Sequence, residues 1–200
     1  MSNALGRFAP IQRLLHWLMA ACIIAMLFIG VGMVSTVAPK YLPLILIHKT
    51  LGVTLLVLVV IRLALRLHYG APPLPADLLP AIKLGARLSH LLLYASMIVM
   101  PLLGLGMLWA AAYPVVLYGG IQIPALLPQS DHVHTLLWNA HAFLGFAFFA
   151  LVLLHLAAAL FHALIRHDGV FATITPLPRR TDEARRMSPR STPGRRAIRE

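Results

Sequence analysis

Hydrophobic residues in this chain gather into four long runs with almost no charge, separated by shorter segments rich in proline, glycine or charged residues. The runs lie near residues 14–37, 43–65, 88–112 and 135–165. Each can cross a bilayer, because a helix needs on the order of 20 apolar residues to span a hydrocarbon core of about 30 Å. Apolar and polar positions do not alternate, which favours helices over barrel strands. The pattern predicts an all-α membrane protein, a bundle of four transmembrane helices.

Composition agrees with a membrane protein. The 200 residues are 60% hydrophobic and 12% charged, with a mean hydropathy of +0.82, outside the usual range of soluble domains. The first run is too long for the core of a signal peptide, so we expect it to stay as a span. Cys22 is the single cysteine, which excludes an internal disulfide and a C-x-x-C-H site for covalent haem.

The positions of the basic residues predict how the chain lies in the membrane. Of the 17 Lys and Arg residues, only Lys40 and Lys49 lie near the first connection, and the third connection, residues 113–134, has none. The others precede the first run, surround the second connection or follow the fourth run. By the positive-inside rule, both termini and the middle connection are cytoplasmic. The basic residues behind the net charge of +11 therefore set the membrane topology and attract anionic lipid. We expect no nucleic-acid partner.

The connecting segments divide the chain further. The middle connection, residues 68–85, is too rich in proline to be helical throughout and predicts a short ordered crossover. The third connection is nearly uncharged and is expected to lie along the outer interface. Pro101, Gly104 and Gly106 predict a kink or a close helix contact in the third span. We assign residues 1–175 to one transmembrane domain and residues 176–200 to a basic, disordered cytoplasmic tail.

Ten histidines are many for so apolar a chain, because polar side chains inside a bilayer are costly and usually functional. Seven of them lie in or near the spans: His16, His48, His90, His134, His141, His155 and His162. His141 and His155 are fourteen residues apart, which on an ideal helix is a rise of about 21 Å and a turn about 40° short of four revolutions. One helix can therefore present two imidazoles on one side, at two depths.

The depths of the histidines predict how they pair. His48 and His141 both lie one to two turns inside the outer membrane face. His16 lies about one turn inside the cytoplasmic face, where both His155 and His162 could meet it. A count from the end of the fourth span favours His162.

A second criterion favours His155 instead: the size of the residue four positions after each histidine. A flat macrocycle bound to a histidine runs along the helix surface, so it needs a small residue one turn away. That neighbour is small in four cases: Ala20 after His16, Gly52 after His48, Gly145 after His141 and Ala159 after His155. It is bulky in three: Tyr94 after His90, Trp138 after His134 and Arg166 after His162.

Two histidine pairs at two depths point to haem iron. Zinc usually recruits a carboxylate, a thiolate or a third histidine, and the chain has only six acidic residues. Haem iron takes one axial imidazole on each face, from facing helices of a bundle. The sequence therefore predicts two haem b groups. The alternative from another class is a metal-ion transporter lined by histidines, which would be colourless.

Four segments resemble the bacterial cytochrome b561 family over about residues 8–175. They are "RLLHWLMA", "LIHKTLGVTLLVLVVIRLALRL", "LSHLLLYASMIVMPLLGLGML" and "NAHAFLGFAFFALVLLHLAAALFHALIRHDG". The cytochrome b subunits of formate dehydrogenases and nickel-iron hydrogenases are similar in plan. The resemblance implies that His48 and His141 ligate an outer haem and that His16 and His155 ligate an inner one.

The resemblance also implies a function, that of a di-haem oxidoreductase of the bacterial inner membrane. Electrons would pass between a donor at the outer, periplasmic face and the membrane quinone pool, and the family includes a superoxide oxidase that reduces ubiquinone. His162, Arg166 and His90 are the candidates for a quinone neighbourhood. Lys49, His132 and His134 are placed to attract an anionic donor. The alternative within this plan is an electron-transfer subunit serving a separate dehydrogenase or hydrogenase.

Overall fold

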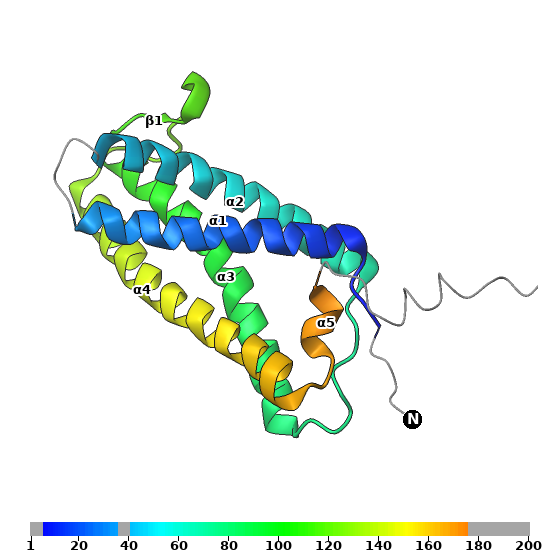
Figure 1. The fold of residues 1–200 in the computed structure, drawn as a ribbon. Helices are drawn as coiled ribbons and strands as arrows, with labels where there is room; N and C mark the ends of the chain where they lie inside the picture. The colour runs from blue at the N-terminus through cyan, green and yellow to red at the C-terminus, as the bar shows by residue number, and fades with distance from the viewer. Residues whose placement is uncertain (1–5, 36–40, 176–200) are drawn as a thin grey trace, which may run out of the picture.

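The computed structural model describes residues 6–35 and 41–175, and four long helices make up most of it (Figure 1). They are α1 (Pro10–Val34), α2 (Tyr41–Tyr69), α3 (Pro80–Ala110) and α4 (Asp131–Phe161). A π-helical turn, η2 (His162–Arg166), continues α4 and leads to the short helix α5 (Val170–Ile174). The predicted disordered tail, residues 176–200, and Lys40 lie outside the described residues.

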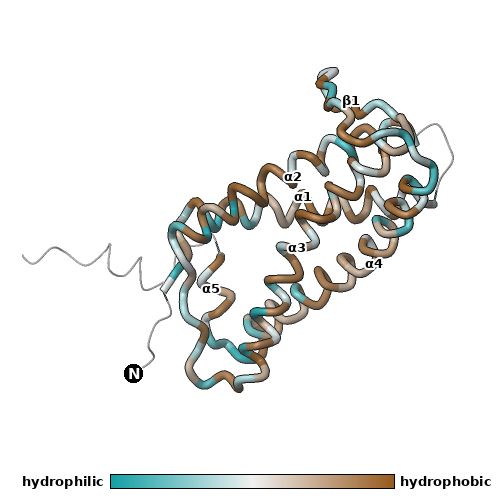
Figure 2. The backbone as a smooth tube through the Cα atoms, turned by 180° about the vertical axis from the view of Figure 1, so that it is seen from behind, coloured by the Kyte–Doolittle hydropathy of each residue, from teal (hydrophilic) through white to brown (hydrophobic). Residues whose placement is uncertain are grey.

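The predicted four-helix transmembrane bundle is confirmed. Each long helix has an 18-residue window with a mean hydropathy between 2.1 and 2.5, which is apolar enough to cross a membrane. Figure 2 shows hydrophobic residues along the helices and more hydrophilic ones at their ends and in the connections. Large apolar side chains such as Phe28 and Phe143 are exposed on the bundle, as expected of residues that face lipid.

The boundaries of the helices differ from those predicted. The third helix begins at Pro80 rather than near residue 88, because proline is well suited to the first helical turn, where its missing N–H is not needed. The proline-rich crossover is therefore shorter than predicted. The fourth helix begins at Asp131, where the Ser130 hydroxyl accepts a hydrogen bond from the N–H of Val133 at 3.4 Å.

The third connection folds into a small hairpin. Strand β1 (Val115–Val116) pairs antiparallel with β2 (Gln122–Ile123), and the turn η1 (Tyr118–Gly120) joins them. The N–H of Tyr118 donates to Thr50 Oγ1 at 2.9 Å, which ties the hairpin to α2. We call this the hairpin end of the bundle, and the opposite end, which holds α5, the terminal end.

The long helices pack in chain order: α1 on α2, α2 on α3, and α3 on α4. Within the described residues, neither α1 nor α2 packs closely on α4. Figures 1 and 2 both show α1 and α2 diverging from α3 and α4 toward the terminal end. The most buried cluster lies between α1 and α2 and consists of Leu15, Met19, Leu55 and Val59.

Glycines bring α3 directly onto α4. A Cβ atom at Gly104 would lie 3.3 Å from Cε1 of His141, and one at Gly106 would lie 3.0 Å from Cδ1 of Leu137. Both distances are shorter than an ordinary carbon–carbon contact, so a Cβ atom at either position would displace the side chain that it meets. This confirms the predicted close helix contact in the third span.

The short helix α5 joins the end of α4 to the start of α1 (Figure 1). Trp17 Nε1 donates to the carbonyl of Ile174 at 3.0 Å, and the N–H of Phe8 donates to the carbonyl of Thr173 at 3.2 Å. The ring of Trp17 also packs on Phe171. These contacts bridge α1 and α4, which do not pack closely on each other in the part of the chain that the structure describes, and they close the bundle at its terminal end.

Candidate haem-binding site

His48 on α2 and His141 on α4 face each other toward the hairpin end. Their ring centroids are 6.1 Å apart and their planes are inclined by 66°. Nδ1 of His141 lies 3.1 Å from the carbonyl oxygen of Met100, so this nitrogen carries the proton and Nε2 keeps its lone pair. Nδ1 of His48 is buried and has no hydrogen-bond partner in the described part of the chain. An unpartnered buried polar atom is one sign of a site completed by a bound group.

Three histidines meet toward the terminal end, one from each of three helices. The ring centroid of His155 on α4 lies 6.4 Å from that of His16 on α1 and 5.5 Å from that of His90 on α3. The sequence placed His90 in a quinone neighbourhood, whereas the structure sets it beside His155. By distance alone, either ring could be the partner of His155.

Helix packing distinguishes the two partners. Gly104 of α3 lies against His141 of α4. Fourteen residues earlier on α3 and fourteen later on α4, the same antiparallel packing sets His90 against His155. A flat macrocycle between His90 and His155 would therefore have to separate two helices in direct contact. His16 and His155, like His48 and His141, come from helices that do not pack closely on each other.

The pairs His16/His155 and His48/His141 fit the axial positions of a haem iron. A metal–imidazole bond is about 2 Å long and the nitrogen is roughly 1 Å from the ring centre, so two axial rings have centroids about 6 Å apart. The observed distances of 6.4 and 6.1 Å agree. In residues 6–35 and 41–175, no group of three or more His, Cys, Asp or Glu side chains is arranged to hold a metal ion.

His162 takes part in a separate polar network at the terminal end. Its Nδ1 lies 2.6 Å from Oδ2 of Asp168, which also accepts from Nε of Arg166 at 3.0 Å. A terminal nitrogen of Arg166 donates to Asp77 of the crossover at 2.6 Å. The π-helical turn η2 and the left-handed conformation of His167, with φ of 52°, reverse the chain so that Asp168 meets His162.

Asp168 lies outside the membrane-spanning segments and is ionised at neutral pH. Burial raises the pKa of its carboxyl group, but the hydrogen bonds from His162 and from the N–H of Val170, with the charges of His162 and Arg166, hold the pKa below its ordinary value. The carboxylate fixes Nδ1 of His162 and leaves Nε2 for another partner. Sequence reasoning missed Asp168, although it is the only acidic residue between Asp131 and the tail.

His134 has a packing role. Its Nδ1 lies 2.8 Å from the carbonyl oxygen of Met107 on α3, seven residues along α4 from the equivalent contact of His141 with Met100. The two contacts repeat along the same pair of helices and fix their register. One nitrogen of His134 is thus engaged inside the bundle.

Four apolar helices with facing histidine pairs at two depths define a membrane-embedded b-type cytochrome as the class of protein. Comparison with known families agrees: the family described as prokaryotic cytochrome b561 matches residues 7–176. The chain therefore belongs to the prokaryotic cytochrome b561 family, whose members carry b-type haem and transfer electrons across the membrane.

Curated relatives extend over nearly the whole chain. Cytochrome b561 homolog 2 of Escherichia coli is 29% identical over 176 residues, 84% of this chain and 90% of the relative. Cytochrome b561 homolog 1 of the same organism is 27% identical over 184 residues, which cover 86% of this chain and 98% of the relative. A Yersinia pestis protein named "Probable superoxide oxidase CybB" is 25% identical over 174 residues, again 86% and 98%.

Proposed function

We propose that this protein transfers electrons through two bis-histidine haem b groups, from a donor at the hairpin end to membrane quinone at the terminal end. His48 and His141 hold one haem, and His16 and His155 hold the other. The observation that supports this most is the pair of facing imidazoles at two depths, each pair bridging helices that do not pack closely together. From the distribution of basic residues, the terminal end is cytoplasmic in this proposal.

The residues of the chain orient the ligands and exclude other chemistry. Held by one histidine from each of two helices, haem would supply a one-electron ferric/ferrous couple and would not bind dioxygen. The Met100 carbonyl fixes the tautomer of His141, and Gly104 leaves room for its ring. At the other end, α5 covers the space between α1 and α4. Electron transfer is therefore outer-sphere on both sides.

The quinone neighbourhood of this proposal consists of His162, Arg166 and His90. Reduction of a quinone to a quinol takes up two protons with the two electrons, so a proton donor must stand beside it. The Asp168 carboxylate holds Nδ1 of His162 at 2.6 Å, so Nε2 is the ring nitrogen that can exchange a proton with a quinone oxygen. Ubiquinone is the acceptor that we propose.

Superoxide is the donor that we propose at the hairpin end. One curated relative bears the name of a superoxide oxidase. Lys49 and His132 lie near this end, and a local positive field raises the encounter rate of a small anion. Each superoxide would give one electron and leave as dioxygen, and two such events would reduce one quinone.

Visible spectra of histidine variants test the ligand set. We expect His141→Ala and His155→Ala each to lose about one haem per chain, and His16→Ala to lose the same haem as His155→Ala. His90→Ala should keep both haems. His134→Ala is the matched control, since His134 contacts α3 from the same helix, and it should also keep both. Absence of a Soret band in the purified protein, or retention of both haems in His141→Ala, would overturn the proposal.

Stopped-flow kinetics test the donor and acceptor. Superoxide should reduce the haem bands of the purified protein, and added ubiquinone should reoxidise them. His162→Ala should slow the reoxidation and leave the reduction by superoxide unchanged. If superoxide leaves the haem bands oxidised, the donor is wrong; if ubiquinone does not reoxidise them, the acceptor is wrong.

A further inference from the structure

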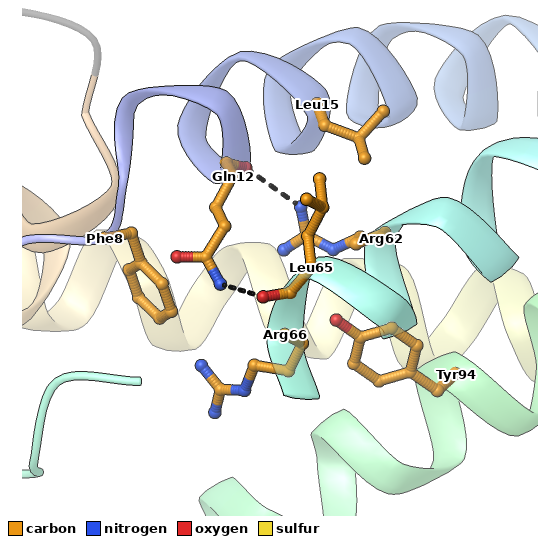
Figure 3. Close-up of a pocket in the computed structure, with 7 residues that line it drawn as sticks. All are labelled: Phe8, Gln12, Leu15, Arg62, Leu65, Arg66 and Tyr94. Atoms are coloured by element: carbon orange, nitrogen blue, oxygen red, sulfur yellow. Dashed lines mark hydrogen bonds between the residues drawn. The ribbon is translucent and has the colours of Figure 1, made fainter. Parts of the chain in front are cut away.

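A small pocket holds two arginines in the terminal half of the bundle (Figure 3). It lies between α1, α2 and α3 and has about 20 Å³ of free space, enough for one or two polar atoms. Arg62 and Arg66 extend into it from successive turns of α2, and Leu15 and Tyr94 line it from the neighbouring helices. A pocket of this size and charge suits a single carboxylate group.

The two guanidinium groups have few partners in the part of the chain that the structure describes. Arg62 donates to the backbone carbonyl of Gln12 at 3.3 Å, and Arg66 lies over the ring of Phe8, 5.2 Å from its centroid. Each guanidinium has five N–H donors, so most remain free to bind an anion. Two like charges inside a span are costly without a counter-ion.

The protein offers these arginines no carboxylate at this end among its described residues. Asp77 and Asp168 are both engaged with Arg166, and Asp168 also with His162. Asp131 lies at the opposite end, in the first turn of α4. Within the described residues no carboxylate is left to neutralise the pocket, and a bound group can supply that counter-ion.

The pocket adjoins the histidine cluster of the terminal half. Leu15 immediately precedes His16, and Tyr94 follows His90 by one helical turn. An anionic substituent on a cofactor held by His16 and His155 can thus lie within reach of Arg62.

We propose that Arg62 and Arg66 form a carboxylate site for a propionate of the haem held between His16 and His155. This inference rests on the proposed function, because it needs a haem at that position. An arginine fork binds a carboxylate through two parallel hydrogen bonds, which also orients the macrocycle. The two positive charges stabilise the ferrous form of this haem and raise its potential relative to the other one. Electrons are thereby drawn from the hairpin end toward the terminal end.

Redox titration of charge variants tests the site. Visible absorbance of the purified protein is followed against potential for the wild type, Arg62→Gln and Arg66→Gln, in phospholipid-free detergent and in nanodiscs with phosphatidylglycerol. In both media, we expect each variant to lower the ferrous-to-ferric ratio of one haem about tenfold at fixed potential, a shift of 59 mV, and to leave the other haem unchanged. Arg87→Gln is the control: it removes an exposed arginine from the same end and should shift neither haem.

The outcomes separate the inference from the proposal beneath it. A protein without haem bands refutes both. Haem-bearing Arg62→Gln with the potentials of Arg87→Gln refutes the carboxylate site alone. A shift that occurs only with phosphatidylglycerol assigns the arginines to a lipid phosphate and also refutes it. If Arg62→Gln loses one haem, Arg62→Lys, which keeps the charge, should retain that haem with a potential near the wild-type value. Loss of the haem in both variants, with no shift in Arg66→Gln, counts against the site.

Discussion

Replacing Gly104 with alanine tests whether the contact of α3 with α4 shapes the His48/His141 pair. The new Cβ would lie 3.3 Å from Cε1 and 3.6 Å from Nδ1 of His141. The shorter distance is below the optimum of about 3.5–4.0 Å between carbon atoms, so the ring must retreat by a few tenths of an ångström. That movement lengthens the hydrogen bond of Nδ1 to the Met100 carbonyl, which is already 3.1 Å.

The opposing contributions to this change can be compared. Overpacking a close contact costs about 1–3 kcal/mol, and weakening a hydrogen bond that orients a ligand costs about 1 kcal/mol more. Alanine gains about 0.5–1 kcal/mol over glycine inside a helix. The steric effect outweighs this gain. With a net cost of roughly 1–3 kcal/mol, we expect haem at the His48/His141 pair to bind about 5- to 150-fold more weakly.

Haem content and the low-spin ferric EPR signals of the purified variant provide the assay. Gly104→Ala should lose or perturb one of the two signals and leave the other unchanged. Gly106→Ala is the control, because its Cβ would meet Cδ1 of Leu137 at 3.0 Å, the end of a flexible side chain that can move aside. The reasoning fails if Gly104→Ala matches the wild type or if Gly106→Ala gives the same change.

Three further predictions concern the terminal end. Asp168→Asn should lower the free energy of unfolding by about 1–3 kcal/mol, because it removes the charged acceptor of His162, and thermal melts at pH 7 measure this. The pKa of the Asp168 carboxyl group is lower in the folded protein than in the unfolded one, where it is about 4. The stabilisation by Asp168 is therefore complete above about pH 4 and is lost as the pH falls through the folded pKa. At that low pH, the melting temperatures of wild type and variant should converge. Gln12→Ala should also destabilise by about 1–3 kcal/mol, because the buried amide donates to two carbonyls at the end of α2; an unchanged melt would contradict this. Trp17→Phe removes the hydrogen bond to Ile174 and should make α5 more susceptible to limited proteolysis, with the Soret band intact.

Depth along the spans was enough to predict that His48 and His141 lie together, and the structure brings their rings within 6.1 Å. Their role as ligands stays a prediction. The depth count favoured His162 over His155 as the neighbour of His16, and it was wrong, because both lie on the same side of one helix near one end and depth separates them poorly. The structure shows His155 beside His16 and His162 bound to Asp168.

His90 and Asp168 show what sequence reasoning could not reach. His90 lies beside His155 only because glycines let α3 and α4 approach in one particular register. Asp168 meets His162 only because the chain passes through a π-helical turn and a left-handed residue after α4. Both features depend on backbone geometry that no local spacing predicts.

The sequence by itself determined the four membrane spans and the helical class, and it singled out the histidines whose rings the structure brings together. Each of these follows from the free energy of placing individual side chains in hydrocarbon, which is local and nearly additive along the chain. Only the tertiary structure decided which helices pack directly and which are held apart, because that depends on the volumes of side chains from several helices meeting at one place. The close contact of α3 with α4 is such a fit, since Gly104 and Gly106 of α3 lie against His141 and Leu137 of α4.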